Sequence, residues 1–306
     1  MYLKQSKEGL TDWWRYAVIL CVVIVLNFMA GLPLAVVSLF KTIEGNASLP
    51  EFANSFDPAA LGLSKNMLLL LMMAPLSLVF FGLTIAIKYI HGYSFTQVFT
   101  SSRRFRWNRF FMAALIWFAF LALSDVAYYL MYPETYEFHF NFREFMVLIL
   151  ICVLFLPMQA SWEELYFRGN LLQGLGLLSR SRVAALIFSS AIFGLVHYFN
   201  PEVKEYGTVN AMINYVGFGL LLGITVIMDG GLEMAFGLHT INNFYAAVFV
   251  SYSGSVLNTP ALISSNHVDG TYMAIAFVVA AILFLLLAKK VFRWKSYKWL
   301  MEPLYD

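Results

Sequence analysis

Residues 16–40 read YAVILCVVIVLNFMAGLPLAVVSLF and contain no charged side chain. A helix needs about 20 successive apolar residues to cross the hydrocarbon core of a bilayer, and this run exceeds that length. The run is also longer than the apolar core of a cleaved signal peptide, although a short basic segment precedes it. We therefore expect a retained membrane-spanning helix here.

The same pattern recurs along the whole chain. The runs show no alternation of polar and apolar residues, which transmembrane strands would require. The sequence therefore predicts an all-α integral membrane protein, a bundle of about eight transmembrane helices in one membrane domain over residues 1–306. Further runs of helical length with few or no charges fall at 66–87, 110–131, 145–162, 183–198, 211–228, 234–250 and 271–288.

The composition agrees with a protein that lies in lipid. Of its residues, 60% are hydrophobic and only 12% are charged, whereas soluble domains have about 25% charged residues. The net charge of +2 gives no reason to expect nucleic acid as a partner. Cys21 and Cys152 lie inside apolar runs and do not form a disulfide framework. The lipid bilayer is thus the first expected partner.

The basic residues predict which ends face the cytoplasm, because Lys and Arg accumulate in short cytoplasmic loops. With the amino-terminus inside and eight crossings, nearly all of the 20 lysines and arginines fall on the inner side. We expect a multi-pass protein of the cell membrane with both termini in the cytoplasm. The outer side keeps only Lys41, Lys65, Arg143 and Lys204.

Two adjacent acids, Glu163 and Glu164, interrupt the apolar sequence at the end of the fourth hydrophobic segment. A charged side chain at the bilayer centre costs about 2.5–3.5 kcal/mol even on lenient insertion scales, so it calls for an explanation. Neighbouring helical residues point about 100° apart, and the two acids therefore need different partners. Glu164 precedes Arg168 by four residues, the favourable order for a structural ion pair. Glu163 is left for another role.

Two histidines and an amide occur in later segments, as His197, His239 and Asn243. A single histidine in a span is more often hydrogen-bonded to a neighbouring helix than catalytic. One polar cavity, however, explains all three residues together with Glu163. Glu163 and His197 are equally far from a predicted turn at 179–182, which brings them level. His239 joins them if the fifth helix is tilted, protrudes or crosses incompletely.

Other polar residues fit ordinary roles. Asp125 in the third segment is expected to hydrogen-bond to a neighbouring helix. His91, His139 and His267 fall in predicted loops and are expected to be solvated.

The polar residues form three motifs in order, EExxxR at 163–168, FxxxH at 193–197 and HxxxN at 239–243. This set resembles the CPBP family of CAAX proteases and bacteriocin-processing intramembrane proteases, also called the Abi family. The resemblance covers a core from Val147 to Phe249, predicted helices four to seven. It implies a hydrolase, an intramembrane endopeptidase of the CAAX-protease type that cuts a membrane-associated protein or peptide.

The resemblance also implies roles for the site residues. Glu163 would activate a water molecule, and His197 would orient that water or carry its proton. His239 and Asn243 would donate hydrogen bonds to the developing oxyanion. This glutamate mechanism requires no cofactor.

A metal-dependent mechanism is the alternative. Two histidines and a carboxylate suffice for a catalytic zinc ion with an open fourth position. Glu163, His197 and His239 are then the candidate ligands of a metalloendopeptidase. The sequence lacks the HExxH pair of the common zinc proteases, which favours the glutamate mechanism.

Two functions without hydrolysis are compatible with the same polar residues. A non-catalytic peptide-binding or bacteriocin self-immunity protein would use the cavity to hold a peptide. A transporter also needs polar groups inside the membrane. The absence of an evident internal repeat makes the transporter the weaker hypothesis.

Overall fold

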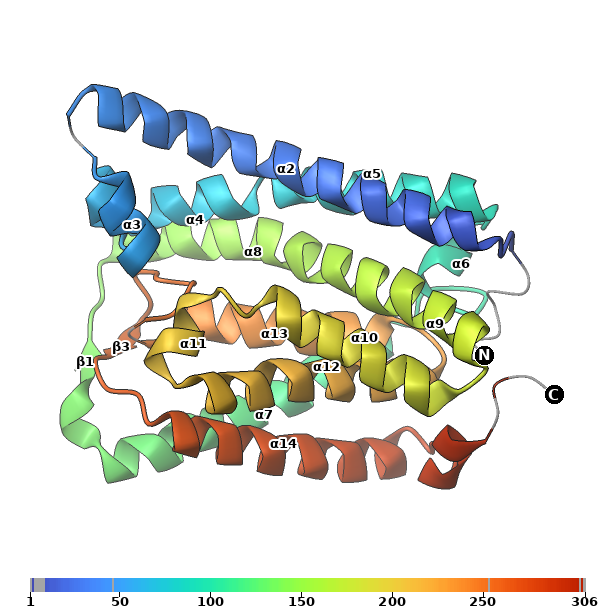
Figure 1. Ribbon diagram of the computed structural model, residues 1–306. Helices are drawn as coiled ribbons and strands as arrows, with labels where there is room; N and C mark the ends of the chain where they lie inside the picture. The colour runs from blue at the N-terminus through green and yellow to red at the C-terminus, as the bar shows by residue number, and fades with distance from the viewer. Residues whose placement is uncertain (1, 3–8, 46, 253, 303, 305–306) are drawn as a thin grey trace.

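The computed structural model describes residues 2, 9–45, 47–252, 254–302 and 304 as a helical bundle (Figure 1). This confirms the predicted all-α membrane fold. The first half contains α2 (Trp13–Ile43), α3 (Leu49–Ser55), η2 (Pro58–Leu61), α4 (Lys65–Met73), α5 (Leu76–His91), α6 (Phe95–Phe99), α7 (Trp107–Met131), η3 (Pro133–Thr135) and β1 (Tyr136–Phe138). The second half contains α8 (Phe142–Glu164), the π-helical turn η4 (Leu165–Leu171), α9 (Leu172–Ser179), α10 (Arg182–Val196), α11 (Pro201–Glu205), α12 (Thr208–Asp229), α13 (Glu233–Val248), β2 (Val250–Tyr252), β3 (Ile263–Ser265), α14 (Gly270–Val291) and η5 (Tyr297–Met301).

The predicted number of eight spans is not confirmed. Among the described residues, six helical segments are long and apolar enough to cross a membrane. The predicted segments at 183–198 and 234–250 form α10 and α13, which have only 15 and 16 residues. At 1.5 Å per residue each is roughly 22–24 Å long, shorter than the hydrocarbon core of about 30 Å. The six long segments are Trp13–Ile43, Lys65–His91, Trp107–Met131, Phe142–Ser179, Thr208–Asp229 and Gly270–Val291.

The short helix α13 lies at the centre of the bundle. Every residue from Glu233 to His239 is buried, and the helix packs against α7, α8 and α12. Helices α2 and α14 lie on opposite faces of the bundle and expose many apolar side chains (Figure 1). Large apolar residues on the outside favour contact with lipid, and the polar residues of α13 are shielded from it.

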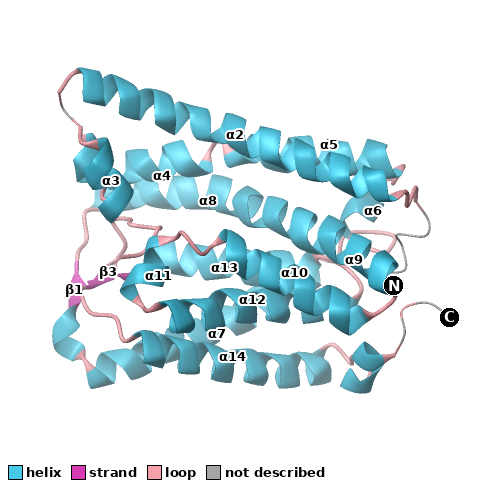
Figure 2. Cartoon of the chain, viewed as in Figure 1, coloured by secondary structure: helices cyan, strands magenta, loops and turns pink. Residues whose placement is uncertain are grey.

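One end of the bundle is capped by small elements. Strands β1, β3 and β2 form a three-stranded sheet in that order, with β1 antiparallel and β2 parallel to β3. The sheet, α3 and α11 lie at the end opposite the start of α2 and the end of α14 (Figure 2). The two ends of the bundle therefore differ, because one carries the caps and the other carries the ends of the chain.

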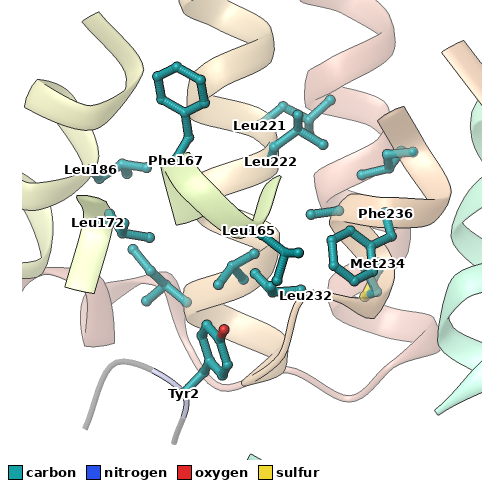
Figure 3. Packing of buried hydrophobic residues seen from close by; sticks show 14 of the residues in the cluster. Tyr2, Leu165, Phe167, Leu172, Leu186, Leu221, Leu222, Leu232, Met234 and Phe236 are labelled. Carbon is teal, nitrogen blue, oxygen red and sulfur yellow. The ribbon is translucent and has the colours of Figure 1, made fainter. Parts of the chain in front are cut away.

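The other end of the bundle is filled by hydrophobic packing (Figure 3). Leu165 and Phe167 of η4 join Leu221 of α12 and Phe236 of α13 in one buried cluster. Tyr2 packs into the same cluster, and its hydroxyl donates to the Val98 carbonyl at 2.6 Å. Interiors packed in this way leave few voids, so this end of the bundle is closed.

A charged cluster fixes the start of α13. Arg106 donates from Nε and Nη2 to the two carboxylate oxygens of Glu233, at 2.9 and 2.7 Å. Its Nη2 also lies 2.9 Å from Asp229 Oδ2, at the end of α12. Glu233 is fully buried. One guanidinium group therefore joins the turn between α12 and α13 to the start of α7.

One histidine departs from the prediction. His91 is the last residue of α5 and is buried, at 2% exposure, instead of being solvated in a loop. Its ring nitrogens lie 3.0 Å from the Leu10 carbonyl and 3.0 Å from Asn170 Oδ1. Leu10 and Tyr16 cover this histidine, which its position between two apolar runs does not reveal.

Candidate active site

The residues predicted to share a polar cavity come from three elements and lie together. Glu163 is in the last turn of α8, His197 caps the end of α10, and His239 and Asn243 lie on one face of α13. Arg168 Nη2 donates to the carbonyl of Gly219, about halfway along α12, at 3.2 Å. The site thus lies near mid-depth of a helix long enough to cross the membrane.

Glu163 has one bound and one free carboxylate oxygen. Gln159 Nε2 donates to Oε1 at 2.6 Å. Oε2 is buried without a hydrogen-bond partner and lies 3.9 Å from Nε2 of His197 and 3.9 Å from Nε2 of His239. These gaps are too long for direct hydrogen bonds, and a water molecule that joins the oxygen to either nitrogen must lie to one side of the line between them.

The tautomers of both histidines follow from their partners. His197 Nδ1 lies 2.7 Å from the Phe193 carbonyl, and His239 Nδ1 lies 2.8 Å from Glu164 Oε1. Both partners only accept, so Nδ1 carries the proton in each ring. When the rings are neutral, both Nε2 atoms therefore have lone pairs. A water molecule has two hydrogens and so satisfies two of the three acceptors that surround this gap.

The spacing of FxxxH has a local cause at the end of α10. The His197 backbone N–H bonds to the Gly194 carbonyl at 3.1 Å, so the helix ends in a tighter turn. The Phe193 carbonyl thereby loses the partner that a continuing helix provides. The His197 side chain bonds to this carbonyl instead. The four-residue spacing thus fixes both the ring position and the protonated nitrogen.

The ion pair that the EExxxR motif predicts is present. Arg168 Nη1 donates to Glu164 Oε1 at 2.8 Å, and both side chains are almost fully buried. Glu164 is the last residue of α8, and Arg168 lies in the π-helical turn η4 that follows it. Such turns are frequent at functional sites. Glu164 Oε1 accepts from both Arg168 and His239. It therefore orients His239, as carboxylates behind catalytic imidazoles do.

The buried charges favour one more positive charge in the site. Glu163 and Glu164 carry two negative charges, and Arg168 supplies one positive charge. The uncompensated charge is costly in a dry interior.

A chain of amide hydrogen bonds ends on Glu163. Trp117 Nε1 donates to Asn242, Asn242 to Asn243, Asn243 to Gln159, and Gln159 to Glu163, at distances between 2.6 and 3.3 Å. Each donor polarises the next, which strengthens such chains. Gln159 was not predicted, although its position one helical turn before Glu163 in an apolar segment is a usable signal.

Close packing of α10 on α12 places His197. A Cβ atom at Gly194 would meet Val216 Cγ2 at 2.4 Å, and one at Gly219 would meet Ser190 Cα at 3.0 Å. Both glycines thus allow the two helices to approach closely, as small residues do in membrane proteins. The His197 ring stacks on Tyr215 of α12 with ring centres 4.7 Å apart.

The site lies in a cavity of about 990 Å³. Its wall at the level of Glu163 is mostly apolar and comes from α2, α7 and α14. Its far end is lined by α11, β2 and the chain after β2, which lie at the capped end of the bundle (Figure 1). The cavity therefore reaches from Glu163 to the capped end of the bundle.

The geometry does not support a metalloendopeptidase. No group of three or more His, Cys, Asp or Glu residues in the described parts of the chain is arranged to hold a metal ion. Ligands on one tetrahedral zinc ion, each about 2.0–2.1 Å from the metal, lie roughly 3.3 Å apart. Glu163 Oε2 is 3.9 Å from each Nε2 atom.

Comparison with known proteins agrees with the three motifs. Residues 143–245 match the family model described as type II CAAX prenyl endopeptidase Rce1-like, which confirms the predicted resemblance. The chain is also similar to the uncharacterized protein YyaK of Bacillus subtilis (strain 168), at 27% identity over 255 residues, 81% of this chain and 82% of YyaK. No solved structure matches the chain significantly.

Proposed function

We propose that this multi-pass membrane protein is an intramembrane endopeptidase that hydrolyses a peptide bond in a membrane-associated protein or peptide. The match of residues 143–245 to the Rce1-like family model supports this proposal. The observation that carries this proposal is the free carboxylate oxygen of Glu163. It is buried, it has no hydrogen-bond partner, and it faces two imidazole nitrogens. A general base needs a free oxygen within reach of the proton that it removes.

In the proposed reaction, a water molecule binds between Glu163 Oε2 and His197 Nε2. Its oxygen attacks the carbonyl carbon of the scissile bond while its proton passes to Glu163. The tetrahedral intermediate then breaks the carbon–nitrogen bond, and the proton passes from Glu163 to the leaving amine. The products are one carboxylic acid, which contains the OH of the water molecule, and one amine, which contains its remaining hydrogen. Gln159 holds the other oxygen of Glu163 during both transfers.

The oxyanion is stabilised by His239 and Asn243 in this proposal. His239 Nδ1 already donates to Glu164, so the ring donates from Nε2 only as an imidazolium. The charge of Glu164 supports that imidazolium. Asn243 Nδ2 uses one hydrogen on Gln159, and its second hydrogen is available for the oxyanion. Preorganised donors of this kind contribute several kcal/mol to transition-state stabilisation.

We place the protein in the cell membrane with the start of α2 and the end of α14 on the cytoplasmic side. Support comes from the four basic residues expected outside. They belong to the ends of α2, α4 and α8 and to α11, at the capped end of the bundle (Figure 1). Most other lysines and arginines lie at the opposite end, as the positive-inside rule requires.

Replacement of Glu163 by Gln tests the proposal. The purified protein in liposomes should cleave a peptide substrate, and Glu163→Gln should lower the turnover about 10²- to 10⁴-fold, because the amide cannot accept the proton. Product formation is followed by mass spectrometry, with and without a chelator. Glu144→Gln, an exposed acid at the start of α8, is the matched control and should retain activity.

Each result of this experiment has a defined meaning. Full turnover of Glu163→Gln contradicts the assigned base. Loss of turnover with the chelator contradicts the metal-free mechanism. Peptide binding without any cleavage in the unmodified protein indicates the non-catalytic binding function.

A further inference from the structure

Glu202 is a buried acid that the proposed reaction does not use. It lies in α11, at 9% exposure, and lines the far end of the cavity that contains Glu163. Its Oε1 accepts hydrogen bonds from the Val256 N–H at 2.7 Å and from the Ser255 hydroxyl at 3.3 Å. Its Oε2 is buried without a hydrogen-bond partner. Ser255 and Val256 occupy Oε1, and the Tyr215 hydroxyl also interacts with the carboxylate, which leaves Oε2 without a close donor.

The surroundings of Glu202 contain acids and phenols but no paired cation. None of the ion pairs formed by described residues includes Glu202. The groups that interact with it electrostatically are Tyr206 and Tyr215. Glu205 lies near the same Tyr206, and Lys204 is exposed on α11. Burial raises the pKa of Glu202, and hydrogen bonds from Val256, Tyr215 and Ser255 oppose that rise.

Glu202 is close to the proposed reaction centre. Asn200 Nδ2 donates to the Tyr215 hydroxyl at 3.0 Å, and the Tyr215 ring stacks on His197. Tyr215 therefore separates Glu202 from the histidine beside Glu163. Glu163, His197, Tyr215 and Glu202 line the same cavity. A peptide that lies along this cavity with its scissile bond at Glu163 therefore passes near Glu202.

We infer that Glu202 determines substrate specificity by binding a cationic side chain, lysine or arginine, of the peptide near the scissile bond. A buried carboxylate with an unused oxygen binds a cation more strongly than a neutral group, because the cation supplies both charge and hydrogen-bond donors. The apolar wall of the cavity accommodates the hydrocarbon part of a lysine or arginine side chain. This inference rests on the proposed function, because it assigns a part of the same substrate.

Peptide pairs that differ in one charge test the inference. Short peptides carry a single lysine at successive positions, and matched peptides carry norleucine there. Binding to the full-length Glu163→Gln protein in liposomes is measured by fluorescence, and cleavage is measured with active protein. We expect lysine to be preferred at one position by about 10- to 100-fold, as for a hydrogen bond between charged groups. Glu202→Gln keeps an acceptor for Val256 and Ser255 and should reduce the preference to near one.

Glu205→Gln is the matched control, because it removes an exposed acid from the same helix. The lysine preference should persist in this variant. Equal binding of lysine and norleucine peptides at every position, or a preference that survives Glu202→Gln, overturns the inference. The binding measurement does not need turnover, and so a lysine preference without cleavage supports the role of Glu202 while contradicting the proposed endopeptidase.

Discussion

Gln159 connects two of the site residues that the motifs identify. It donates to Glu163 and accepts from Asn243, and it is 8% exposed. Its amide therefore orients the proposed base and at the same time holds the proposed oxyanion donor. It does not touch the reacting atoms, so its role is positioning.

Replacement of Gln159 by Leu should lower the turnover number about 10- to 100-fold with little change in KM, because a hydrogen bond to a charged group is lost. Peptide cleavage by the variant at several substrate concentrations separates the two constants. Gln173→Leu removes a similarly buried glutamine from α9, which bonds to Tyr2 and Tyr93 outside the site. It should lower stability and leave the turnover number unchanged. Equal loss of turnover in both variants contradicts the positioning role.

The motif residues could be located from sequence because an ionisable side chain inside the membrane is energetically costly and is therefore rare without a structural or functional role. Glu163, His197 and His239 stand out from apolar surroundings for that reason. Gln159 has no charge and was overlooked in the same helix. Glu202 lies in a short helix outside the apolar runs, where acids are ordinary. Its burial depends on residues 255–256, more than 50 positions later, which local patterns cannot reveal.

The helix boundaries show why two predicted spans are too short. Apolar runs at 183–198 and 234–250 predict helices correctly, but the same composition occurs in helices buried by protein and in helices facing lipid. The continuous segment Phe142–Ser179 has 38 residues, roughly 57 Å at 1.5 Å per residue. It is longer than the hydrocarbon core of about 30 Å, and α10 returns from its end for only 15 residues. The short α10 therefore ends at His197 partway along the bundle, where both His197 and His239 face Glu163.

Loss of the Arg106 cluster should destabilise the packing of α7, α12 and α13. Arg106→Gln leaves Glu233, which is fully buried, without its cation, and breaking a buried pair costs about 3–5 kcal/mol. Thermal unfolding in detergent should show a clear decrease in Tm. Arg103→Gln removes an exposed arginine from the same segment and should have no comparable effect. A Tm equal to that of the unmodified protein contradicts the structural role of Arg106.

The whole molecule has one closed end and one end toward which the cavity extends. The closed end contains the cluster of Figure 3, and the cavity reaches α11 and β2 at the other end. In the proposed orientation, the closed end faces the cytoplasm. Substrate then enters from the outer side or between helices. The sequence could predict the sidedness of charges but not the direction of the cavity, which depends on how side chains from six or more elements pack together.

Thiol labelling checks this direction. In a variant with exposed Cys21 replaced by Ser, Ser255→Cys places a thiol on the cavity wall and Lys290→Cys places one at the other end of the bundle. A membrane-impermeant maleimide added to intact cells should label Ser255→Cys, and a peptide substrate should slow that reaction. Lys290→Cys should react only after permeabilisation. The reverse pattern contradicts the orientation.

Glu163 Oε2 and His197 Nε2, the two converging acceptors that hold the proposed water molecule, define what an inhibitor of this protein should look like. A compound that presents two hydroxyl donors on one tetrahedral carbon, such as a hydrated activated ketone, offers hydrogens to lone pairs that water would otherwise occupy. Under the proposed metal-free mechanism, a hydroxamate, which gains its usual affinity for proteases by chelation, lacks that advantage. Inhibitor design on this proposal therefore begins from donor geometry.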